Sequence, residues 1–182
     1  MRRAAPALLF ALAAALLPAC GIDATLLQPD CASEDPDTLV LMAQAVPTAE
    51  LVPCLGGLPA GWEFGTLDVR QDRVQLVLNS DRGGDHALTV ELRGACHPGE
   101  AKRVPSDEAG AKRFERVRRL RPYSGVRYYQ FRGGCVIYDF ELESERSSAL
   151  LNEASIMVNF VSRDDLRERV IEQSDGVITD AP

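Results

Sequence analysis

The fold of this chain is decided by Val74-Gln75-Leu76-Val77-Leu78-Asn79 and by Leu88-Thr89-Val90-Glu91-Leu92-Arg93, which follows after a short polar segment. In both runs every second residue is Val or Leu, and in the later run the residues between them are polar. This period of two predicts two β-strands, each with one buried side and one side facing solvent. The polar residues between the runs, which include Gly83-Gly84, predict a hairpin turn.

The other strands follow on both sides of this pair. Residues 63–69 precede it, and Val136 to Glu143 alternates in the same way. Gly133-Gly134 is a strong two-residue hairpin signal that joins this last strand to one containing Tyr129 and Phe131. Residues 112–121 fit a short helix as well as an irregular strand, so both remain open.

Helices are expected at both ends of the folded part. A short helix is predicted over residues 37–45, and residues 51–61, rich in Pro and Gly, are expected to form an ordered loop. Ser162 is expected to cap the last helix. Another helix is predicted because several apolar residues fall on one helical face: Leu150, Ala154, Met157, Val158 and Val161. The prediction is an α+β fold, an antiparallel sheet of about five or six strands with C-terminal helices packed on one face.

The N-terminus is typical of an exported chain. Arg2 and Arg3 precede an uncharged, Leu- and Ala-rich run that is too short to span a bilayer comfortably, since about 20 residues are needed. The run ends in Leu17-Pro18-Ala19-Cys20, which resembles the lipobox of bacterial lipoproteins, although Pro18 departs from the residues usual at that position. The resemblance implies cleavage just before Cys20 and a diacylglyceryl group on its sulfur. An ordinary signal peptide with an incidental Cys20 is the alternative.

The lipobox also defines the expected organisation of the chain. Residues 1–19 are predicted to be a lipoprotein signal peptide, residues 20–36 a lipidated acidic tether, residues 37–175 a single α+β domain and residues 176–182 a frayed tail. The predicted location is extracytoplasmic, at the cell membrane, where the lipid anchor is the contact with the bilayer.

Four cysteines follow Cys20, at positions 31, 54, 96 and 135. An even number in an exported chain indicates two disulfides. Three pairings are open, and we favour Cys31 with Cys54 and Cys96 with Cys135 because each pair joins neighbours in sequence. A metal site at Cys96-His97 is disfavoured because no second Cys or His lies at ligand spacing beside it.

Part of the domain resembles a group of uncharacterised actinobacterial envelope proteins. The resemblance rests on Arg127-Tyr128-Tyr129, on Gly133-Gly134-Cys135-Val136 and on Leu151-Asn152-Glu153-Ala154-Ser155. It extends over most of residues 38–173. It implies an envelope protein and transfers neither an activity nor a site residue.

The charge distribution is uneven. The chain has a formal net charge of −7, which makes nucleic acid a poor partner, yet residues 101–132 hold ten Lys and Arg against three Asp and Glu. We interpret this segment as a candidate patch for an anionic envelope polymer, a lipid head group or an acidic protein. Alternatively, its arginines pair with the acidic strand at residues 139–145. The candidate residues are Arg113, Arg116, Arg118, Arg119, Arg121 and Arg127.

The sequence predicts no catalytic residue, cofactor or metal. No Ser has the Gly-x-Ser-x-Gly setting of an esterase, and only His86 and His97 are available as a base. The main hypothesis is therefore a non-catalytic, lipid-anchored binding protein of the envelope. The alternative is an envelope hydrolase acting on glycan or another polymer through paired carboxylates. A carrier of small ligands is a third hypothesis, which requires a large apolar cavity. The carboxylates in question are Asp139, Glu141, Glu143 and Glu145.

Overall fold

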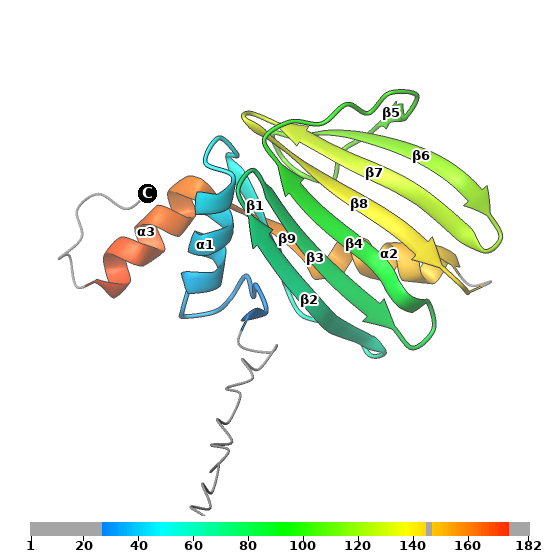
Figure 1. Cartoon of the computed structure of the whole chain (residues 1–182), viewed down its shortest axis with the longest axis horizontal. Helices are drawn as coiled ribbons and strands as arrows, with labels where there is room; N and C mark the ends of the chain where they lie inside the picture. The colour runs from blue at the N-terminus through cyan, green and yellow to red at the C-terminus, as the bar shows by residue number, and fades with distance from the viewer. Residues whose placement is uncertain (1–26, 145–146, 175–182) are drawn as a thin grey trace, which may run out of the picture.

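A computed structural model describes residues 27–144 and 147–174 (Figure 1). Its centre is an antiparallel sheet of seven strands in the order β2-β3-β4-β8-β7-β6-β5. The predicted signal peptide, Cys20, Glu145 and the C-terminal tail lie outside the described residues. The strands are β2 (Trp62–Arg70), β3 (Arg73–Ser80), β4 (Gly84–Arg93), β5 (Lys102–Val104), β6 (Lys112–Leu120), β7 (Tyr123–Phe131) and β8 (Gly134–Leu142).

The two alternating runs form β3 and β4 and are joined by a tight turn, as predicted. The hairpin between β7 and β8 is also confirmed. Gly133 has φ of +70° there, and a Cβ at this position would collide with the carbonyl oxygen of Thr48, so the turn requires glycine. For residues 112–121 helix and strand were both open; residues 112–120 form the strand β6, and Arg121 lies in the turn that follows.

A second sheet of two strands was not predicted. β1 (Leu51–Leu55) pairs antiparallel with β9 (Val158–Ser162). The prediction of a loop over residues 51–61 was therefore wrong at its start, because Pro53 is tolerated in a strand that has a full partner strand on one side only. The prediction that Val158 and Val161 continue a helix was also wrong. Their β-branched side chains, with Phe160 between them, favour an extended chain.

The helices are α1 (Asp37–Ala45), α2 (Ser147–Met157) and α3 (Arg163–Gln173). Figure 1 shows α2 behind the seven-stranded sheet, whereas α1 and α3 lie beyond one end of it. The predicted packing of C-terminal helices on one face therefore holds for α2, while α3 contacts α1 and β9. Ser162 caps α3 as predicted, and its Oγ accepts a hydrogen bond of 3.0 Å from the N–H of Asp165.

The core lies between α2, the two-stranded sheet and the inner face of the seven-stranded sheet. Opposite residues of neighbouring strands share a face, so the aligned Val90, Tyr138 and Arg127 mark this inner face. Tyr138 is fully buried, and its hydroxyl donates to the carbonyl oxygen of Val158 in β9 at 3.4 Å. Trp62 is 4% exposed and also belongs to the core. Large buried side chains thus fill the space between sheet and helices.

Two disulfides are present, Cys31–Cys54 and Cys96–Cys135, with the pairing that the sequence favoured. The first ties the segment before α1 to β1, where the N–H of Cys31 also donates to the carbonyl oxygen of Leu55 at 2.9 Å. Disulfides of this kind are typical of an oxidising, extracytoplasmic compartment. Within the described residues, none of the three helices combines the length and apolar character needed to cross a membrane.

Candidate functional site

The sheet divides the six candidate arginines between its two faces. In the strand register, Arg113 lies opposite Tyr129 and Arg127 lies opposite Tyr138, so these two arginines belong to the inner face. Arg116 lies opposite Val126, which lies opposite Asp139 on the outer face. The predicted patch is therefore not one continuous surface.

The inner arginines belong to a hydrogen-bonded network with a structural role. Arg127 is 7% exposed, and it donates to Glu115 Oε1 and to Ser155 Oγ in α2, both at 2.6 Å. Its guanidinium lies over the ring of Phe140, 5.5 Å from the centroid. Arg113 donates to the same Glu115 oxygen at 2.6 Å. Neither side chain is available to a partner.

The network includes the loop between β5 and β6. Asp107 of this loop lies 3.0 Å from Arg113 Nη1 and accepts a hydrogen bond of 2.9 Å from the hydroxyl of Tyr129. Burial raises the pKa of Tyr129 to about 12, and the neighbouring carboxylate of Asp107 adds to this shift. Burial alone would raise the pKa of Glu115, but the hydrogen bond from Arg113 and the charge of Arg127 lower it below its ordinary value. The ion pairs are therefore formed at neutral pH.

Arg118 is occupied on the outer face. Arg118 lies at a register shift of the β6–β7 pairing, between Val117 and Arg119. Its guanidinium reaches across β7 to the acidic strand β8. It donates to both carboxylate oxygens of Asp139 and, at 2.9 Å, to Glu141 Oε1. For this arginine, the alternative interpretation of pairing with the chain's own acidic strand is the right one.

The outer face has a shallow trough of about 470 Å³ whose charged side chains are also paired. Glu91 lies 2.7 Å from Arg93 and 3.6 Å from Arg73. Asp139 and Glu141 line the same trough, held by Arg118, and do not face each other across a deep cleft. The described residues contain no group of three or more His, Cys, Asp or Glu that could hold a metal ion. This geometry gives the hydrolase hypothesis no support.

The remaining candidates gather where β6 ends and turns into β7. Arg116 and Arg121 are exposed and have no ion-pair partner within residues 27–144 and 147–174. Arg119 donates to the carbonyl oxygen of Pro122 at 2.8 Å and lies 3.5 Å from Glu141. Beside them Val117 is 51% and Leu120 is 73% exposed. We call Arg116, Val117, Arg119, Leu120 and Arg121 together the β6-end surface.

Sequence reasoning identified the arginines of this surface but missed its two apolar residues. Val117 and Leu120 recur at a spacing of three with Phe114, which left helix and strand open and did not indicate whether these residues are exposed. In the strand, Val117 lies opposite Gly125 and Leu120 opposite Tyr123, and both side chains are exposed. A spacing of three within a strongly basic segment was the available signal that they are not core residues.

A search of protein-family models, curated proteins and solved structures finds no match to this chain.

Proposed function

We propose that this protein is a lipid-anchored, extracytoplasmic binding protein that captures an acidic partner through the β6-end surface. The observation that carries the proposal is the presence of exposed, unpaired arginines next to exposed Val117 and Leu120 in a chain of net charge −7. Partner-binding surfaces commonly combine apolar side chains with arginine.

Two arginines of this surface, Arg116 and Arg121, differ from most arginines of the basic segment. Arg113, Arg118, Arg127 and Arg132 all form ion pairs with carboxylates of the chain itself. Arg116 and Arg121 do not, among the residues that the structure describes. Exposed ion pairs contribute only about 0.2–1 kcal/mol each, so these charges select and steer an acidic partner, while burial of Val117 and Leu120 supplies much of the affinity.

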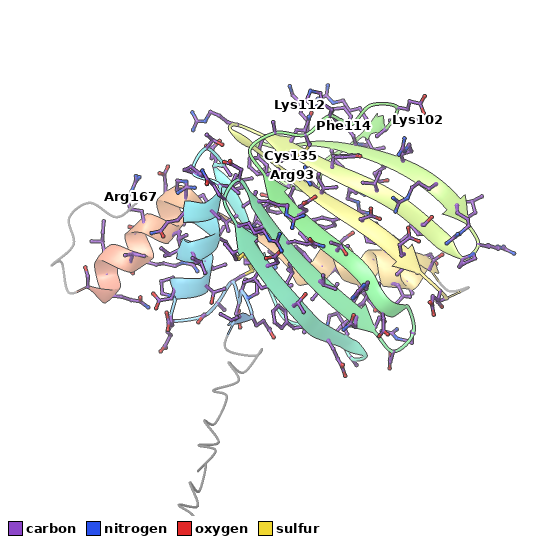
Figure 2. The ribbon with its side chains drawn as sticks, in the orientation of Figure 1. Arg93, Lys102, Lys112, Phe114, Cys135 and Arg167 are labelled. Carbon is purple, nitrogen blue, oxygen red and sulfur yellow. A yellow bond between two sulfur atoms is a disulfide. The ribbon has the colours of Figure 1, made fainter. Side chains whose placement is uncertain are left out.

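Charge reversal tests the binding surface. We expect Arg116→Glu combined with Arg121→Glu to weaken cross-linking of the anchored protein to its acidic partner in the host, with an unchanged circular dichroism spectrum. Lys112→Glu is the matched control, because Lys112 is exposed, lies at the opposite end of β6 and has no ion-pair partner among the described residues (Figure 2). Equal capture by the double variant and by the wild type would refute the proposed surface.

The anchor rests on the lipobox and is supported by the two disulfides, which fit an exported chain. We expect the intact mass of the native protein to correspond to a chain that starts at Cys20 and carries a diacylglyceryl group. Reduction of the two disulfides adds four hydrogens to this mass. A chain without lipid would remove the anchor from the proposal, and the binding surface would be unaffected.

A further inference from the structure

The strand β6 has a free edge over its second half. β5 pairs only with Arg113, Phe114 and Glu115, through three residues of its own. On the side away from β7, no strand of the described chain pairs with Arg116–Leu120. An unpaired edge of this kind presents backbone N–H and C=O groups to which another chain can add a strand.

The two sides of this edge differ in chemistry. Val117 lies opposite Gly125 and Leu120 opposite Tyr123, and both side chains are directed to the inner side of the sheet. Arg116 lies opposite Val126 and Arg119 opposite Ser124, on the outer side. The edge thus has an apolar row on one side and a cationic row on the other.

We propose that this edge binds an extended segment of a partner protein in which acidic and apolar residues alternate, added to the sheet as an eighth strand. The inference rests on the proposed function and specifies its binding mode. In an added strand successive side chains alternate between the two faces, so acidic residues meet Arg116 and Arg119 while apolar residues meet Val117 and Leu120. Backbone hydrogen bonds provide affinity, and the alternation provides specificity.

The charge of the edge decides between this occupant and a second copy of the same chain. Pairing of two β6 edges would bring the arginines of one copy against those of the other, and like charges on paired strands are destabilising. Arginine at an edge therefore disfavours self-association, and the same charges favour an acidic strand. The register shift at Arg118 increases the local twist, so the added strand is short.

The test uses the native protein in a non-ionic detergent and a labelled seven-residue peptide that alternates Glu and Val. Binding is measured by fluorescence anisotropy at low and at physiological ionic strength. Two further peptides have the same side chains but are N-methylated at every second backbone amide, one at the Glu residues and the other at the Val residues. Each N-methylated peptide can no longer donate hydrogen bonds along one of its two edges, so each blocks strand pairing in one orientation. Poly-glutamate provides acidic charge without alternation, and a Lys-Val peptide has the opposite charge.

We expect the Glu-Val peptide to bind, one of the N-methylated peptides to bind at least about tenfold more weakly, and the Lys-Val peptide not to bind. Leu120→Glu and Arg116→Glu should each weaken binding, and Lys112→Glu should not.

Equal binding of all Glu-Val peptides would overturn strand addition and leave the proposed function intact. Failure of every acidic probe, poly-glutamate included, would overturn both. A concentration-dependent dimer that Arg116→Glu strengthens would identify a second copy as the occupant, and would also overturn the inference.

Discussion

The burial of Arg127 predicts that its replacement destabilises the fold. Arg127→Ala removes the charge-assisted bonds to Glu115 and Ser155 and leaves a cavity beneath the ring of Phe140. Loss of one member of a buried ion pair costs about 3–5 kcal/mol. The side chain of Glu115 is 34% exposed and keeps its bond from Arg113, so the cost falls at the low end of that range. We expect a loss of about 3 kcal/mol in the free energy of unfolding.

Urea unfolding followed by the fluorescence of Trp62, the only tryptophan, provides the assay. The same loss corresponds to a fall of about 6–12 °C in Tm. Arg127→Met keeps the apolar contact with Phe140 while it removes the charge, so we expect a smaller loss of about 1–2 kcal/mol. Arg132→Ala is the matched control, because its ion pair with Glu50 is on the surface and Arg132 is 84% exposed. A loss for Arg127→Ala no larger than that for Arg132→Ala would refute the structural role of the inner network.

Three further predictions concern the rest of the fold. Glu153→Ala removes the acceptor of the 2.7 Å hydrogen bond from Trp62 Nε1, so we expect a changed tryptophan emission maximum and a loss of about 1–3 kcal/mol; an unchanged spectrum would contradict this bond. Burial raises the pKa of Tyr129 to about 12, so the stabilisation by its neutral hydroxyl is complete below pH 10 and is lost as the pH rises through 12. Tyr129→Phe should therefore lose less stability than the wild type between pH 10 and 12, as measured by urea midpoints. Identical pH profiles of the two proteins would exclude a contribution from the ionisation of Tyr129. Replacing Cys96 and Cys135 together by Ser should lower stability by about 2–5 kcal/mol in the same urea assay, and full retention of stability would show that this disulfide is dispensable.

The sequence predicted the strands whose signal is local. β3 and β4 alternate along their own length, and the turn between β7 and β8 contains a Gly pair, so neither required knowledge of distant residues. β1 has no alternation and contains Pro53, and its identity as a strand depends on β9, more than a hundred positions later. Val158 and Val161 fit a helical face as well as a strand, and only the partner strand decides between the two.

The sequence predicted which arginines could form the candidate site but not how they are arranged in space. The number of arginines in the basic segment is visible in the sequence, but the face on which each one lies depends on the register of β6 against β7. The register shift beside Arg118 directs its guanidinium to the acidic strand, and no local sequence pattern predicts that shift. The burial of Arg127 likewise depends on Ser155 and Phe140, which come from α2 and β8.

The Cys31–Cys54 disulfide determines how the folded part responds to mechanical force. Tension applied from the N-terminal side reaches Cys31 and passes through the sulfur atoms directly to Cys54 within β1. The residues between the two cysteines, α1 among them, form a closed loop that bears no tension, so α1 is not peeled from the core. The load falls instead on the ladder of β1 and β9, in which all five residues of β1 are paired. Reduction of this one bond would reroute the force through α1, and the helix would then unravel before the sheet.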